Sequence, residues 1–148
     1  MVKLWIFFHF NVEFRGGTYI LHFIMRLGFI GTGQISKAVI NGILKSKIKY
    51  SKIYISKRNS KISSELSKKS KKIIVVKENQ EILNKSNWIF LGVTPTVGNK
   101  ILKNLKFKSS HTIINFISTI GTSQLKKYIK VKSKIVRALP LPPIALRK

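Results

Sequence analysis

From Met25 onward, short apolar runs alternate with segments whose apolar residues recur at helical spacing. The runs predict six strands, at residues 26–30, 52–56, 73–76, 88–92, 112–116 and 134–138. The segments between them predict helices near residues 34–44, 61–70, 79–85, 97–105 and 123–128. Strands separated by crossover helices are typical of an α/β fold, so we expect a doubly wound, mainly parallel six-stranded sheet with helices on both faces.

Residues 1–24 lie outside this alternation, and we expect a non-domain amino-terminal extension there, ahead of a single domain at 25–139. Its two apolar runs, Leu4–Phe10 and Tyr19–Ile24, are both shorter than the ~20 apolar residues needed to cross a bilayer. No Ala-x-Ala-like site follows the first run, as a cleaved signal peptide would require. A misplaced start codon ahead of Met25 explains the extension, and a functional anchor is the alternative. We expect a cytoplasmic protein with no membrane partner.

A Gly-x-Gly turn stands between the first predicted strand of the domain and its first helix. Gly31 permits a tight turn, and Gly33 lacks a Cβ, so that a phosphate can approach the backbone. The helix then offers free N–H groups and the positive end of its dipole to the anion. Ser36 takes the place of a third small residue, which allows close helix–strand contact. The turn indicates a Rossmann-type dinucleotide site, with an ordinary strand–helix turn as the alternative.

The second strand ends at Ser56, followed by Lys57, Arg58 and Asn59. A domain that prefers NAD carries an acidic residue at this point, which bonds the ribose 2′-hydroxyl. A hydroxyl, two cations and an amide suit a 2′-phosphate instead. This turn therefore favours NADP (NADPH) as the cofactor, unless Lys57 and Arg58 are only two more solvated bases.

The chain carries 29 Lys and Arg residues against four acidic ones, a formal net charge of +25. Lys far outnumbers Arg and is spread over nearly every segment, whereas nucleic-acid sites favour Arg interleaved with aromatic residues. We expect nonspecific nucleic-acid binding as a side effect of this charge. A basic anion- or nucleic-acid-binding module on a degenerate Rossmann scaffold is the alternative function. With no cysteine, three scattered histidines and four acidic residues, no metal site is expected.

Four stretches carry a resemblance to a known family. They are Gly28-Phe-Ile-Gly-Thr-Gly-Gln-Ile-Ser36, Asn79-Gln-Glu-Ile82, Trp88-Ile-Phe-Leu-Gly-Val-Thr-Pro95 and Arg137-Ala-Leu-Pro-Leu-Pro-Pro143. In order, they are similar to Gly-Phe-Ile-Gly-x-Gly-x-Met-Ala, Asn-x-Glu-Val, Val-Phe-Leu-Ala-Val-Lys-Pro and Arg-Ala-Met-Pro-Asn-Thr-Pro. These are motifs of the amino-terminal half of pyrroline-5-carboxylate reductase, which residues 25–145 resemble over almost their whole length.

The resemblance implies an oxidoreductase of proline biosynthesis that passes a hydride from NADPH to the ring C=N of a small cyclic imino acid. It also implies three groups of cofactor-binding residues. The pyrophosphate would be held by Ile30, Gly31, Thr32, Gly33, Gln34 and Ile35. The adenosine end would be held by Ser56, Lys57 and Arg58, and the part nearer the nicotinamide by Asn79, Val93, Thr94 and Pro95. No residue is a credible general acid for the imine nitrogen, so no catalytic residue is assigned.

Some residues depart from the family pattern. Thr94 stands in place of Lys, and Leu141 stands in place of Asn. Family members continue into an all-helical dimerisation domain that supplies most of the imino-acid pocket, whereas this sequence ends at Lys148. We therefore expect residues 140–148 to be a truncated linker, and the chain to be incomplete as a catalyst on its own. Its expected partners are the imino acid and either a second copy or a separate helical-domain chain; a non-functional gene fragment is the alternative.

Overall fold

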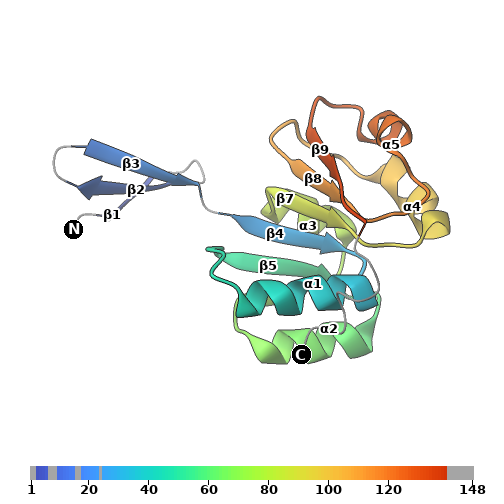
Figure 1. The fold of residues 1–148 in the computed structure, drawn as a ribbon, viewed down its shortest axis with the longest axis horizontal. Coiled ribbons are helices and arrows are strands. Elements are labelled where there is room, and N and C mark those ends of the chain that lie inside the picture. The colour runs from blue at the N-terminus through green and yellow to red at the C-terminus, as the bar shows by residue number, and fades with distance from the viewer. Residues whose placement is uncertain (1–2, 7–9, 16–17, 24, 140–148) are drawn as a thin grey trace.

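The main body of the chain is one six-stranded sheet in which every strand is parallel to its neighbours (Figure 1). The computed structural model describes the backbone of residues 3–6, 10–15, 18–23 and 25–139, and the side chains of residues 25–139. In chain order the strands of this sheet are β4 (Arg26–Ile30), β5 (Lys52–Ser56), β6 (Ile73–Val76), β7 (Trp88–Leu91), β8 (Thr112–Asn115) and β9 (Lys134–Arg137). Their order across the sheet, β6-β5-β4-β7-β8-β9, is that of a Rossmann-type doubly wound sheet, so the predicted fold is confirmed.

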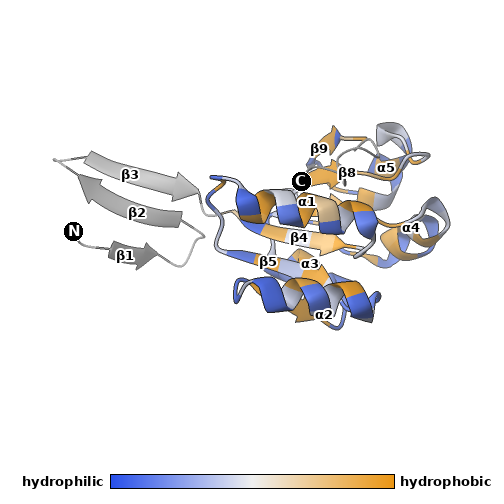
Figure 2. Cartoon of the chain, turned by 60° about the horizontal axis from the view of Figure 1, so that its bottom comes forward, coloured by the Kyte–Doolittle hydropathy of each residue, from blue (hydrophilic) through white to orange (hydrophobic). Residues whose placement is uncertain are grey.

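Helices cover the two faces of the sheet through two separate apolar clusters. The connecting helices are α1 (Gln34–Lys45), α2 (Ser60–Lys69), α3 (Asn79–Lys85), α4 (Pro95–Ile101), the 3-10 helix η1 (Leu102–Asn104) and α5 (Thr122–Ile129). Ile40 of α1 and Leu66 of α2 belong to one cluster, whereas Leu83 of α3, Leu102 of η1 and Leu125 of α5 belong to the other. The buried residues of α1 are Ser36, Ile40 and Ile43, and hydrophobic and hydrophilic stretches alternate along this helix in Figure 2. Helices therefore lie on both faces, as predicted.

The direction of the chain across the sheet explains this division. From β4 the chain moves outward to β5 and β6, and it then crosses back to β7, β8 and β9 on the other side of β4. Because crossovers between parallel strands are right-handed, a reversal of direction moves the helices to the opposite face. The loops after β4 and β7 consequently diverge, and ligands of open α/β sheets bind at this switch point.

Residues 3–23 contain a second sheet that the sequence did not predict. β1 (Lys3–Ile6), β2 (Phe10–Arg15) and β3 (Thr18–Phe23) are antiparallel and pair in chain order. None of these strands pairs with the six-stranded sheet. No helix in the part of the chain that the structure describes is long and apolar enough to span a membrane. The predicted linker at 140–148 lies outside the described residues.

Candidate functional site

The turn between β4 and α1 requires a glycine at its first position. Gly31 has a φ of +94°, in the region that residues with a side chain rarely adopt. A Cβ on Gly31 would lie 2.5 Å from the carbonyl oxygen of Gly92 and 2.6 Å from a methyl carbon of Val93. Glycine is therefore needed both for the backbone angle and for the close approach of the loop that follows β7.

The second glycine of the turn leaves open space in front of a helix terminus. Gly33 is the N-cap of α1, which has no side-chain cap and no acidic residue in its first turn. A Cβ on Gly33 would meet no atom of the protein within 4 Å, so packing does not require glycine here. The first N–H groups of α1 point into this space at the positive end of the helix dipole. The turn therefore fits a phosphate group that approaches the backbone closely.

Ser36 makes the tight contact between α1 and the sheet. Its side chain is fully buried, and its hydroxyl donates a hydrogen bond of 2.6 Å to the carbonyl oxygen of Gly31. A Cβ on Gly92 would collide with the Ser36 hydroxyl. The third small residue of the motif thus lies at the close helix–strand contact expected for it.

The turn after β5 is tied to the glycine turn through Ser56. The Ser56 hydroxyl is buried and accepts a hydrogen bond of 3.2 Å from the Gly31 N–H, and the Ser56 carbonyl accepts one of 2.9 Å from Thr32 Oγ1. The hydroxyl is thus used to join the two turns. Asn59 is the N-cap of α2, where its Oδ1 accepts a 3.2 Å hydrogen bond from the Ile62 N–H. The side-chain NH2 group of Asn59 can therefore donate hydrogen bonds to a ligand.

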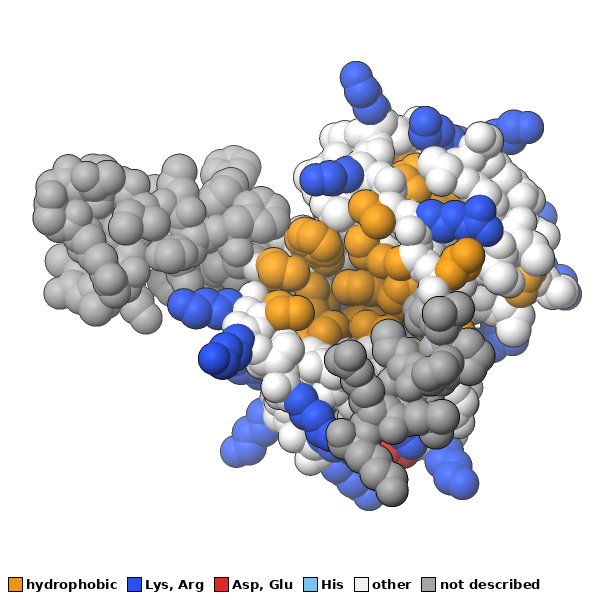
Figure 3. Space-filling model, in the orientation of Figure 1, with side chains coloured by type: hydrophobic (Ala, Val, Ile, Leu, Met, Phe, Trp, Pro, Cys, Tyr) orange, Lys and Arg blue, Asp and Glu red, His pale blue; other side chains and the backbone are white. Residues whose placement is uncertain are grey.

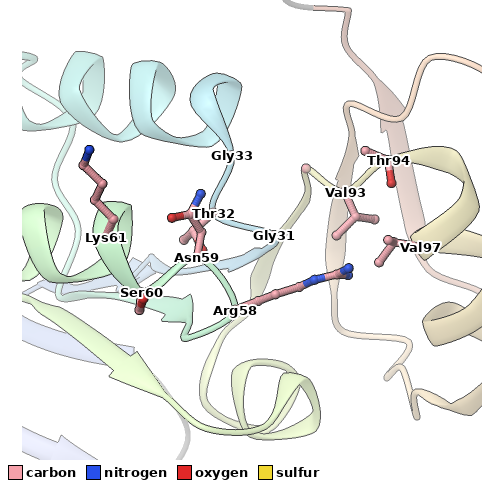
Figure 4. A pocket seen from close by; sticks show the side chains of 11 residues that line it. Gly31, Thr32, Gly33, Arg58, Asn59, Ser60, Lys61, Val93, Thr94 and Val97 are labelled. Carbon is pink, nitrogen blue, oxygen red and sulfur yellow. The ribbon is translucent and has the colours of Figure 1, made fainter.

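The turns after β4, β5 and β7 together form an open groove of about 450 Å³ at the switch point. It is lined by Gly31, Thr32, Gly33, Arg58, Asn59, Ser60, Lys61, Gly92, Val93, Thr94 and Val97. In Figure 4 the Arg58 side chain extends across the groove toward Val93 and Val97, while Asn59 and Lys61 lie on the side of α2. Two cations, several polar groups and backbone N–H groups, with no acidic side chain in the lining, suit an anionic ligand.

The structure brings together part of the predicted cofactor-binding set. The predicted residues that line the groove are Gly31, Thr32, Gly33, Arg58, Val93 and Thr94, together with Asn59, whose amide the sequence suggested for a 2′-phosphate. The predicted residues that do not line it are Ile30, Gln34, Ile35, Ser56, Lys57, Asn79 and Pro95. Ile30 is fully buried in the core at the end of β4, and Lys57 is exposed outside the groove. Asn79 begins α3 at the far end of the sheet order, after β6.

Four lining residues were missed by the sequence analysis, namely Ser60, Lys61, Gly92 and Val97. Ser60 and Lys61 form the start of α2, so the first turn of the second helix was the available signal. Gly92 ends the apolar run of the fourth strand of the domain, and a small residue at that position was the available signal. Val97 had no such signal, because its place depends on α4 beginning at Pro95.

The groove holds no group suited to metal binding or to proton transfer at neutral pH. Its lining contains neither His nor a carboxylate. Within residues 25–139, whose side chains the structure describes, no three His, Asp or Glu residues gather where they could hold a metal ion. The cations and polar groups that do line the groove suit the binding of an anionic ligand.

A sheet of this order, with a glycine turn opening a helix at the switch point, defines a dinucleotide-binding domain. The family model described as "NADP oxidoreductase coenzyme F420-dependent" matches residues 26–119, which is most of the domain. The chain therefore belongs to this family of oxidoreductases. Within it, the resemblance to the pyrroline-5-carboxylate reductases is confirmed by the relatives that the sequence matches.

The similar proteins include curated sequences and solved structures. The chain is 28% identical to pyrroline-5-carboxylate reductase 3 of Danio rerio over 127 residues, which cover 84% of this chain and 43% of that relative. It is 24% identical to pyrroline-5-carboxylate reductase 2 of Bacillus subtilis, covering 83% of this chain and 45% of that one. The Plasmodium falciparum pyrroline carboxylate reductase with NADP bound is 24% identical, with a TM-score of 0.67, over 82% of this chain and 44% of the other.

The chain spans less than half the length of the curated relatives that it matches. The same holds for solved structures with this fold, because the chain covers between 42% and 50% of each of eight of them. The shared part is the nucleotide-binding domain. In each of these proteins at least as much polypeptide lies outside the match.

Proposed function

We propose that this chain binds NADPH and forms the nucleotide-binding half of a reductase that acts on the ring C=N of a small cyclic imino acid. The observation that carries the proposal is the groove at the switch point, which combines the Gly31–Gly33 turn with a cationic turn after β5. The glycine turn fits a pyrophosphate, and the second turn fits a 2′-phosphate. Membership of the oxidoreductase family and the reductases among its relatives support the substrate class.

The pyrophosphate would lie at the start of α1. Gly33 leaves the space for it, and the N–H groups of the first helical turn donate to its oxygens. Gly31 keeps the carbonyl of Gly92 close by, so the loop after β7 borders the same space. Val93 and Thr94 of that loop then line the side of the groove on which the nicotinamide would lie. When bound, NADPH supplies the hydride for the reduction.

The preference for NADPH over NADH would come from the adenosine side of the groove. Arg58 and Lys61 supply two positive charges, and Asn59 supplies amide donors. Ser56, which the sequence assigned to the same task, is engaged with Gly31 instead. A 2′-phosphate gains charge-assisted hydrogen bonds from this set, whereas a 2′-hydroxyl has no carboxylate to bond.

Titration of the purified chain with NADPH and NADH tests the cofactor. We expect saturable NADPH binding that is at least tenfold tighter than NADH binding. Arg58→Ala should weaken NADPH binding by about tenfold, since a charged hydrogen bond contributes roughly 1.5–3 kcal/mol, and should leave NADH binding nearly unchanged. Lys57→Ala is the matched control, because Lys57 is an exposed cation next to Arg58 that does not line the groove.

Absence of saturable NADPH binding, or tighter binding of NADH, would overturn the proposal. The substrate is tested by NADPH oxidation that depends on pyrroline-5-carboxylate. The groove lining contains neither a His nor a carboxylic acid to protonate an imine nitrogen, and we expect turnover only when a second copy or a separate helical chain completes the site. Oxidation by the single chain alone would contradict that part of the proposal.

A further inference from the structure

Every strand of the six-stranded sheet has a cation at or just before its first residue. Because the strands are parallel, their amino ends all lie along one edge of the sheet, which we call the amino edge. In the order across the sheet, the cations nearest the strand starts are Lys72, Lys52, Arg26, Lys85, Lys108 and Lys134. The fold therefore turns lysines that are far apart in the sequence into one row.

Backbone contacts place neighbouring members of this row side by side. Arg26 and Lys52 are register partners of β4 and β5, and the Lys72 carbonyl accepts a 2.9 Å hydrogen bond from the residue after Lys52. At the other end of the sheet, the Lys108 carbonyl accepts a 2.9 Å hydrogen bond from the hydroxyl of Ser133, directly before β9. With about 4.8 Å between neighbouring strands, the six strands extend the row over roughly 24 Å.

The loops that enter the strands add further lysines and no carboxylate. Four more exposed lysines lie in the loops before β5, β6 and β9, namely Lys47, Lys49, Lys71 and Lys132. Of the row and these four, only Lys85 forms an ion pair within residues 25–139, with Glu81. Figure 3 shows Lys and Arg side chains projecting around the outline of the domain, with little acidic surface in view. The amino edge is thus strongly positive and almost unpaired in the described part of the chain.

Helix dipoles explain only part of this charge. Lys45, Lys69 and Lys85 lie in the last turns of α1, α2 and α3, where a cation is favourable. The loop lysines lie beyond the helix ends, and the dipole effect falls off within the last turn. Lysines such as Lys49 and Lys71 therefore repel one another without a compensating contact, and a bound polyanion would relieve that repulsion.

The opposite edge of the sheet, where the groove lies, has a different charge pattern. The loops after β4, β7 and β8 contain no Lys or Arg. The cations that line the groove are Arg58 and Lys61, which suit the phosphates of a small ligand. A polyanion at the amino edge and a dinucleotide in the groove would therefore occupy opposite ends of the strands.

We propose that the amino edge binds the phosphate backbone of a double-stranded nucleic acid, at a site separate from the groove. A duplex carries about one negative charge per 1.7 Å of its axis, so the row would face roughly 14 phosphates, whereas a single phosphate would contact only one or two lysines. Lysine binds phosphate as a point charge and does not read the bases. A membrane surface is disfavoured, because no aromatic side chain is among the exposed large apolar ones within residues 25–139.

Fluorescence anisotropy of the full chain with a labelled DNA duplex tests the location. Lys49→Glu with Lys71→Glu should weaken binding at least tenfold at low salt. It should also lower the slope of log affinity against log salt by about 2, since each lost phosphate contact removes about 0.9. Lys57→Glu with Lys77→Glu is the matched control and should weaken binding no more than about threefold. All four lysines are exposed and both pairs change the charge equally, but the first pair precedes β5 and β6 and the second pair follows them.

The same titration in saturating NADPH tests whether the two sites are separate. We expect an unchanged duplex affinity, because ligands at opposite edges of the sheet do not compete. Release of the duplex by NADPH would place it in the groove and overturn the proposal, as would an equal loss of affinity in both variant pairs. If the chain binds no NADPH, the proposed function fails, but the comparison of the two pairs still decides this inference. Binding of phosphatidylserine vesicles that only the first pair loses, with equal duplex binding in both pairs, would assign the edge to a membrane and overturn it.

Discussion

The buried ring of His111 shows how a single residue joins distant parts of the domain. Its Nδ1 accepts a hydrogen bond of 3.1 Å from the Lys108 N–H, so the proton of the neutral ring lies on Nε2, which donates to the Leu83 carbonyl at 3.0 Å. The ring thereby links the start of β8 to α3. Burial lowers the pKa of His111, the charge of Lys108 lowers it further, and the Leu83 hydrogen bond opposes the shift.

This lowered pKa makes folding stability depend on pH. The unfolded chain takes up a proton on His111 near the ordinary histidine pKa of about 6.5, whereas the folded chain does so only at lower pH. The contribution of neutral His111 to folding stability is therefore fully present above about pH 6.5, and it decreases as the pH drops below that value. Urea unfolding at several pH values should show this decline, and His111→Leu should remove the His111 part of it. That variant should also lose roughly 1–3 kcal/mol of folding stability, because the Leu83 carbonyl and the Lys108 N–H lose their hydrogen bonds to the ring. An unchanged pH dependence in His111→Leu would contradict the assignment.

At the scale of elements, the amino-terminal sheet and the nucleotide-binding domain are separate units of pairing. β1, β2 and β3 bond only to one another, and β4 begins the six-stranded sheet at Arg26. We therefore propose that residues 1–24 are not part of the domain.

Deletion of residues 1–24 tests this division. The remaining chain should keep its NADPH affinity and should melt within a few degrees of the full chain, since no ladder hydrogen bond of the larger sheet is lost. Thermal unfolding and NADPH titration provide the two measurements. A deletion through Ile30, which also removes the central strand β4, is the contrasting control and should not fold. Loss of NADPH binding on removal of residues 1–24 alone would show that they belong to the domain.

At the scale of the whole molecule, few acidic side chains are available to pair with the excess of Lys and Arg. Among the described side chains, Glu65 pairs with Lys37 and Lys69, and Glu81 pairs with Lys85. The remaining cations are spread over the surface, apart from those that gather at the groove and along the amino edge. The molecule should therefore attract polyanions without reading their sequence.

We expect the chain to bind two unrelated DNA duplexes of equal length with equal affinity at low salt. The affinity should fall by about a thousandfold or more between 50 and 200 mM salt, because binding of this kind depends on counterion release. Fluorescence anisotropy at a series of salt concentrations measures both properties. Discrimination between the duplexes that persists at physiological salt would favour the alternative function of a nucleic-acid-binding module.

Some elements could be predicted closely, and the exceptions have identifiable causes. All six strands of the domain were placed within one residue at each end, because their apolar runs are short and interrupted by turn residues. The fourth helix was expected at 97–105 but begins at Pro95, which is favourable at the first helical position, and it tightens into η1 at Leu102. The hairpin of β2 and β3 was missed, although Gly16-Gly17 between two apolar runs was a usable signal.

The sequence alone determined the order of strands and helices, the glycine turn and the cationic turn after β5, since each depends on residues close together in the chain. Only the tertiary structure decided which of these residues share the groove. It buried Ser56 under the glycine turn and brought Lys61 and Val97 to the groove, because those positions depend on how separate crossovers meet at the switch point. It also left Val136 of β9 exposed. That outcome follows from the handedness of the crossovers, which a pattern of apolar residues along the chain does not contain.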